Sequence, residues 1–249
     1  MSPDGHDILT YAKLADGARF FLDGAFLSIH EALTYDYACI LFSNRLECIE
    51  PSSEDKAISA SYTPLQDVIG MLREDIENPL SPATITSMSA AWQESLNIAQ
   101  AGSHRFFKDH AIGSINILGH LNNLGFFFET LLNRHLLFLR QTKAVDEFSY
   151  SRISAARTME RMIYLFKNEL NTNTLQLNEI SFLFSLRNKT VHFTPDNAKA
   201  LQPKLSELSR IWNQMHDVLG LFEKKEQFNE EPFSHLLKAS AATVESRWT

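Results

Sequence analysis

The most constraining feature of the sequence is a set of apolar residues that recurs at alternating steps of four and three. These residues are Leu201, Leu205, Leu208, Trp212, Met215, Leu219 and Phe222. Such spacing places them along one side of an α-helix that packs nearly parallel to its neighbours. Only nine glycines occur in 249 residues, and few segments alternate apolar and polar residues as strands do. The chain is therefore predicted to be all-α.

Apolar residues at helical spacing predict three further helices ahead of this one. A long helix is expected over about residues 112–141, a second over 156–170 and a third over 175–186. Their apolar stripes are Ile117, Leu121, Leu124, Phe128 and Leu131, widened by Phe126, Phe127 and Leu132; then Ala156, Met159, Ile163, Phe166 and Leu170; then Leu175, Ile180, Leu183 and Leu186. With 201–222, these segments predict a four-helix up-and-down bundle. Pro232 predicts a short extra helix through Leu237.

Residues 1–102 predict an additional helical region ahead of the bundle. Two helices are expected at its start, because segment 28–31 has the spacing of a capping box, in which a serine begins a helix. Further helices are expected after Pro64 and over 85–99. Gly102 and Ser103 then end the helical pattern of apolar residues. The expected domains are 1–102, an acidic helical region to which the sequence assigns no function, and the bundle at 103–249.

Charge is distributed unevenly along the chain. The formal net charge is −7, but residues 1–102 carry −10, residues 103–215 carry +5 and residues 216–249 carry −2. Arg157 and Arg161 belong to a cluster of cationic residues in the basic part. Two interpretations remain open: these side chains form solvated helix faces, or they bind a ligand that bears phosphate.

Segment 182–196 combines an arginine, an asparagine and a histidine. Arg187 and His192 would point about 140° apart on a regular helix, so they can meet only where the helix ends. The β-branched residue Thr190 and the proline at 195 predict such an end. We therefore expect the Arg187 side chain to swing toward the imidazole of His192, so that both groups reach one substrate.

Arg187, Asn188 and His192 resemble the signature of the HEPN family, in which an arginine and a polar residue precede a histidine at this spacing. The resemblance extends over about residues 103–225, because the motif follows two shorter helices and precedes a long one. It implies a metal-independent endoribonuclease of toxin, phage-defence or RNA-processing type, acting as a dimer that joins two motifs. Other members of the family only bind, so a non-catalytic HEPN-like interaction module is the alternative.

The chemistry of RNA cleavage suits these residue types. A histidine has a pKa near neutrality, so His192 is expected to act as general acid or base on the ribose 2′-hydroxyl or the leaving oxygen. The guanidinium of Arg187 would stabilise the charged pentacoordinate phosphate, and Asn188 would position it. The cationic residues expected to bind the substrate are Lys189, Arg157 and Arg161. The expected product is a 2′,3′-cyclic phosphate, and neither a metal nor a cofactor is expected.

Other features narrow the class of protein. The two cysteines, Cys39 and Cys48, cannot form a disulfide framework, and no C-x-x-C zinc motif occurs. Phosphate-binding loops and hydrolase triad motifs are also missing from the sequence. No signal peptide or membrane span is encoded, so a cytoplasmic protein without a membrane partner is expected. The expected partners are RNA, a second copy of the chain, and an antitoxin or sensor protein.

Two single residues carry further expectations. Glu129 lies on the apolar long helix, and a buried carboxylate needs a partner. We expect Arg134 or an arginine of a neighbouring helix to pair with it. A second copy of the chain would need exposed apolar surface near the motif, for which Phe193 is the candidate.

Overall fold

The computed structural model describes residues 5–46, 82–102, 105–106, 109–166, 177–191, 201–226 and 232–249. Within these ranges it contains eight helices and no strand, although an isolated bridge joins Ala111 and Lys204. The helices are α1 (Gly5–Leu46), α3 (Pro82–Ala101), α4 (Ile117–Gln141), α5 (Glu147–Ala155), α6 (Thr158–Phe166), α7 (Asn178–Val191), α9 (Leu205–Glu226) and α10 (Phe233–Trp248). The prediction of an all-α protein is confirmed for this part of the chain. The helix expected after Pro64 lies outside the described residues.

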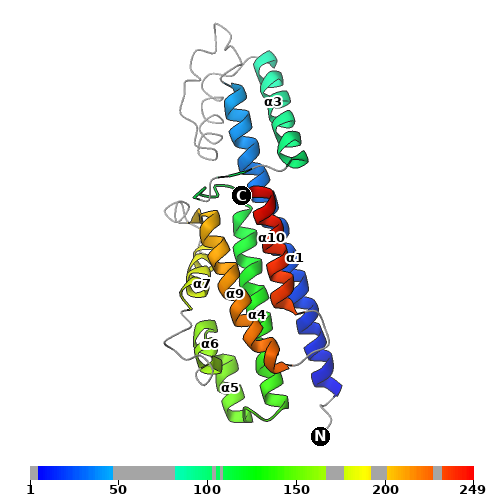
Figure 1. Ribbon diagram of the computed structural model, residues 1–249, viewed down its shortest axis with the longest axis vertical. Coiled ribbons are helices and arrows are strands. Elements are labelled where there is room, and N and C mark those ends of the chain that lie inside the picture. Colours follow the sequence, from blue (N-terminus) through cyan, green and yellow to red (C-terminus); the bar gives the residue numbers. More distant parts are fainter. Residues whose placement is uncertain are drawn as a thin grey trace.

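Helix α1 is a single helix of 42 residues, about 63 Å long, that runs along most of the molecule (Figure 1). The prediction of two helices here was wrong, because Ser28 does not begin a helix. Its side chain instead faces α4, where a Cβ added at Gly119 would lie 2.7 Å from the Ser28 hydroxyl oxygen. Gly24 likewise faces Asn123 of α4. Small residues at these contacts let the two helix backbones approach closely.

Helices α1, α4, α9 and α10 lie side by side and share one hydrophobic core (Figure 1). The stripe predicted on α9 is confirmed, since all seven residues from Leu201 to Phe222 are buried. Helix α10 extends to Trp248, eleven residues beyond the predicted end at Leu237, and its inner face also carries Phe233 and Val244. It covers α9 and α1, so residues 18–33 of α1 belong to the same core as the bundle. The division of the chain into regions 1–102 and 103–249 stays a prediction.

Helices α4 to α7 follow the predicted stripes in part. The five stripe residues of α4 are buried, but Phe126 is 39% exposed, and α4 begins at Ile117 rather than near residue 112. The seam predicted over 156–170 was wrong at Ile163, which is 55% exposed. The core-facing residues of α6 are instead Met162 and Leu165, because this short helix carries apolar residues on more than one face. On α7, all three stripe residues that the structure describes, Ile180, Leu183 and Leu186, are buried as predicted.

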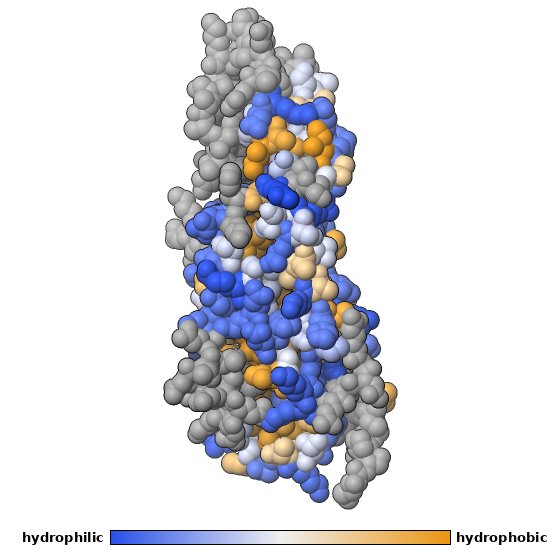
Figure 2. Space-filling model, in the orientation of Figure 1, coloured by the Kyte–Doolittle hydropathy of each residue, from blue (hydrophilic) through white to orange (hydrophobic). Residues whose placement is uncertain are grey.

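Helix α3 packs against the far end of α1 (Figure 1). The Trp92 ring makes edge contacts with Tyr35 and Phe42, and Arg45 pairs with Glu94. On the face drawn in Figure 2, apolar side chains gather where α3 and this end of α1 lie, whereas the middle of the face is mainly hydrophilic. None of the helices described here combines the length and apolar character that a bilayer crossing requires.

Candidate functional site

Arg187 lies in the last turn of the described part of α7, and its side chain crosses α4. Its Nη1 donates to Glu129 Oε1 at 3.2 Å, and its guanidinium stands 4.6 Å from the centre of the Phe126 ring. The aliphatic part of the side chain passes over Gly125, where an added Cβ would lie only 3.0 Å from Arg187 Cδ. The side chain is 18% exposed. Arg187 is therefore held from three directions while part of it still reaches the surface.

Glu129 connects α7 and α6 through α4. Besides the Arg187 guanidinium, its Oε1 accepts a hydrogen bond from the Thr158 hydroxyl at 2.5 Å. One turn further along α4, Asn133 accepts a hydrogen bond from Arg161 at 2.5 Å. The expected arginine partner of Glu129 is thus confirmed as one from a neighbouring helix. The result is a polar strip on α4 that faces the start of α6 and the end of α7, which we call the α4 strip.

The last turn of α7 is tied to α4 as well. The Thr190 hydroxyl lies 2.7 Å from both the Asn122 side-chain oxygen and the Arg187 carbonyl oxygen. Asn122 and Glu129 therefore hold the Arg187 turn from two points, seven residues apart on one face of α4.

The structure brings some of the predicted site residues together. Arg187 and Arg161 both reach the α4 strip, whereas Arg157 is exposed just before α6 and its backbone N–H donates to Glu160. Asn188 is exposed and Lys189 is half-buried in the same turn as Arg187. His192 and Phe193 lie outside the described residues, so the convergence of Arg187 and His192 stays a prediction.

Two other residues of the site were not predicted, although sequence gave partial signals for them. Phe126 was assigned to the core, but it is the surface on which Arg187 stacks. Gly125 was not singled out, yet it provides the space that the Arg187 side chain fills. A glycine inside a helix costs up to about 1 kcal/mol of stability relative to alanine, which is the signal that could have drawn attention to it.

His120 is a core histidine rather than a functional group. Its Nδ1 donates to the Ala25 carbonyl oxygen at 2.8 Å, and its Nε2 accepts from the Trp212 indole N–H at 3.2 Å. Burial lowers the pKa of His120 to about 4, so the imidazole is neutral at physiological pH. Both ring nitrogens are satisfied, which leaves none for a ligand.

A second buried polar cluster joins the start of α1 to the end of α9. Glu226 accepts hydrogen bonds from the Tyr11 hydroxyl at 2.7 Å and from His135 Nδ1 at 2.8 Å, with Arg134 Nε 3.8 Å away. Burial, followed by the charge of Glu226, raises the pKa of Tyr11 far above its usual range. Arg134 also stacks over the Tyr11 ring. This cluster holds helices together, because its charged groups are buried and paired with one another.

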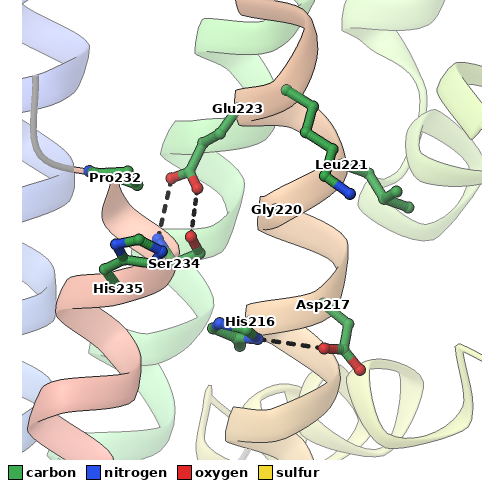
Figure 3. A pocket seen from close by; sticks show the side chains of 9 residues that line it. His216, Asp217, Gly220, Leu221, Glu223, Pro232, Ser234 and His235 are labelled. Atoms are coloured by element: carbon green, nitrogen blue, oxygen red, sulfur yellow. Dashed lines mark hydrogen bonds and ion pairs between the residues drawn. The ribbon is translucent and has the colours of Figure 1, made fainter. Parts of the chain in front are cut away.

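A groove of about 570 Å³ lies between α9 and α10 (Figure 3). His216 and His235 line it from the two helices, and the Glu223 carboxylate accepts hydrogen bonds from the backbone and hydroxyl of Ser234. His216 also follows Arg210 with five residues between them, and the signature allows four to six, but apolar Ile211 stands where the signature has a polar residue. Arg210 instead pairs with Glu179 of α7 at 3.2 Å, away from the groove, so this second match forms no joint site.

Within the described ranges, histidine, cysteine and carboxylate side chains form no group of three or more that could hold a metal ion. Scans against protein-family models, curated proteins and solved structures found no match to this chain. The candidate site therefore rests on its own residues: Arg187, with Glu129, Phe126 and Gly125 around it, and the exposed Asn188 that follows.

Proposed function

We propose that this protein is a metal-independent endoribonuclease of the HEPN type, with its bundle in residues 103–249. The observation that supports the proposal is the position of Arg187, whose side chain is held by Glu129, Phe126 and Gly125 and is 18% exposed, in the sequence turn that precedes His192. A cation held in place before substrate arrives needs little reorganisation when charge develops on a phosphate. Its environment therefore suits transition-state stabilisation.

The proposed reaction divides the chemistry between two residues. His192 removes the proton from the ribose 2′-hydroxyl or protonates the leaving oxygen, and Arg187 stabilises the phosphate charge. Arg187 Nη1 already donates to Glu129, while Nη2 has no acceptor among the described residues and can donate to a phosphate oxygen. Arg161 at the other end of the α4 strip, with Arg157 and Lys189, would bind neighbouring phosphates. Asn188, exposed beside Arg187, would position the scissile group.

The biological setting follows from the same resemblance. Two copies that meet through the motif face would place two arginines and two histidines around one scissile phosphate, so acid and base come from different subunits. We place the protein in the cytoplasm as a toxin or phage-defence effector, and an antitoxin or sensor protein would control it. The acidic region 1–102 is available for such control.

A non-catalytic HEPN-like binding module is the second candidate. The observation that favours it is the Arg187–Glu129 ion pair, because both side chains are about four-fifths buried and the carboxylate offsets the arginine charge. In that case Arg187 would stabilise the packing of α7 on α4, and the motif would make no contact with a substrate.

Cleavage of RNA in EDTA separates the two candidates. Wild-type protein is incubated with tRNA and mixed single-stranded RNA, together with His192→Ala and Arg187→Ala variants. We expect wild type to cut, and each variant to lose at least about 100-fold in rate. The products should carry 2′,3′-cyclic phosphates.

Matched controls come from the second arginine–histidine match. Arg210→Ala removes an arginine–glutamate pair of the same length, 3.2 Å, and His216→Ala removes a histidine from a surface groove. Both controls should cut at nearly the wild-type rate. Equal cutting by wild type and the His192 and Arg187 variants, or no cutting at all, would refute the endoribonuclease and leave the binding module.

A further inference from the structure

A series of aromatic rings leads away from Arg187 across α4 to α1. The Arg187 guanidinium lies 4.6 Å from the Phe126 ring, the Phe126 ring is 5.3 Å from that of Phe21, and the Phe21 ring is 5.6 Å from that of Phe20. Phe126 is 39% exposed and Phe20 is 72% exposed. The series therefore begins at the candidate site and ends on an open surface of α1.

The exposed rings, together with the arginine, suit a ligand that has both flat aromatic groups and phosphates. A single exposed phenylalanine is common on protein surfaces. Here, however, Phe21 contacts both exposed rings, Phe20 and Phe126, and Phe126 also stacks on the Arg187 guanidinium. Aromatic side chains beside arginines are how proteins bind unpaired bases, since every base offers a flat face and every nucleotide a phosphate.

The two ends of this series of rings differ in charge. Arg187 stands at one end, whereas exposed Asp16 and Asp23 lie one turn to either side of Phe20 on α1, together with Arg19. Carboxylates repel phosphates, but they accept hydrogen bonds from the amino groups of bases. The arrangement therefore favours a phosphate at Arg187 and a base at Phe20.

We propose that Phe126 and Phe20 form a stacking surface for unpaired bases of single-stranded RNA, with α1 supplying its outer part. The inference rests on the proposed function, because it takes the phosphate at Arg187 as the anchor of the strand. It gives the start of region 1–102 a role in substrate binding, and it restricts the substrate to RNA with unpaired bases next to the cleavage position.

Binding is measured by fluorescence polarisation with a labelled single-stranded RNA, using His192→Ala protein so that the RNA stays intact. Adding Phe20→Ala should weaken binding about 5- to 100-fold, the range found when a stacked base loses its aromatic partner. Phe20→Trp should restore binding, whereas Phe20→Leu should not, because leucine is apolar but has no ring. When the same RNA carries abasic positions, the His192→Ala protein should bind it with the same affinity whether or not Phe20→Ala is added.

Phe148 provides a matched control. It is 71% exposed, almost as much as Phe20, and the Arg152 guanidinium lies 5.7 Å from the centre of its ring, but it belongs to α5, which packs beside the end of α4 away from Arg187 (Figure 1). Phe148→Ala should leave RNA binding within about twofold, as for ordinary surface substitutions. A fully paired duplex should show no dependence on Phe20.

Several outcomes would overturn the inference. Unchanged binding by Phe20→Ala, full binding by Phe20→Leu, or equal losses for Phe20→Ala and Phe148→Ala would each exclude a stacking surface. A dimer that dissociates on size-exclusion chromatography when Phe20 is replaced would assign the rings to a second copy of the chain. Failure of the endoribonuclease proposal is distinguishable: wild type would cut no RNA, yet binding would still depend on Phe20.

Discussion

The close contact between Gly119 of α4 and Ser28 of α1 gives the sharpest test of the fold. A Cβ at position 119 would lie 2.7 Å from the Ser28 hydroxyl oxygen and 3.2 Å from its Cβ, both shorter than ordinary van der Waals contacts. Gly119→Ala gains about 1 kcal/mol of helix propensity but forces an overpacked contact that costs about 1–3 kcal/mol. The net expectation is a loss of up to about 2 kcal/mol in the free energy of unfolding.

A double-mutant cycle isolates this contact. Ser28→Ala removes the closest atom, so Gly119→Ala should be less destabilising by about 1 kcal/mol or more in that background. The free energies are measured by urea unfolding followed by circular dichroism. Gly220→Ala is the control, because a Cβ there meets no atom within 4 Å, and it should stabilise by about 1 kcal/mol. Additivity of the two substitutions within about 0.5 kcal/mol would mean that α1 and α4 do not meet at Ser28.

Three further predictions concern the site and the buried polar groups. Gly125→Ala should displace the Arg187 side chain by a few tenths of an ångström and lower the RNA cleavage rate about tenfold, with less than about 1 kcal/mol change in stability; an unchanged rate would show that the arginine needs no such placement. Tyr11→Phe should lower the free energy of unfolding by about 1.5 kcal/mol or more, because Glu226 loses a hydrogen-bond donor, and urea unfolding would contradict this if the midpoint did not move. The pKa of His120 is about 4 in the folded state and near 6.5 in the unfolded state. The contribution of this neutral histidine to the free energy of unfolding is therefore complete above pH 6.5 and is lost as the pH falls to 4, a difference of about 3 kcal/mol. Unfolding midpoints measured across this range should therefore fall less with acid in His120→Gln than in wild type.

The sequence predicted those helices whose apolar residues keep a regular phase. The stripe on α9 was found because seven residues share one face without interruption, and its burial follows from that face alone. On α6 the prediction chose the wrong face: apolar residues lie on two neighbouring faces, and Met162 and Leu165 face the core while Ile163 faces outward. Periodicity alone does not decide between two apolar faces, since packing against neighbouring helices selects the one that is buried.

The capping-box prediction failed for a related reason. Ser28 and Glu31 have the spacing that begins many helices, but serine also suits a close contact between two helices, and a single residue does not tell these uses apart. The partner, Gly119, lies about ninety residues later in the sequence. Only the fold brings the two small residues opposite each other.

Part of the candidate site was also predictable. A carboxylate on an apolar helix needs a partner, and this reasoning anticipated an arginine for Glu129 without deciding that it would be Arg187. The stacking role of Phe126 was not accessible, because three successive phenylalanines on one helix point in different directions, and only packing decides which of them remains at the surface. The exposed ring of Phe20 is likewise a consequence of where α4 meets α1.

The length of α1 has a consequence for the order in which the protein is made. The apolar face of α1 is covered by α4, which begins about 70 residues after α1 ends. At ordinary rates of synthesis the part of that face that α4 covers waits roughly 4 to 14 s for α4 to begin. The Trp248 indole, which donates to His30 from 218 residues away, arrives roughly 10 to 40 s after it. During this interval the apolar face of α1 between Ala18 and Leu33 stands uncovered, which makes the nascent chain a natural client for a chaperone at the ribosome.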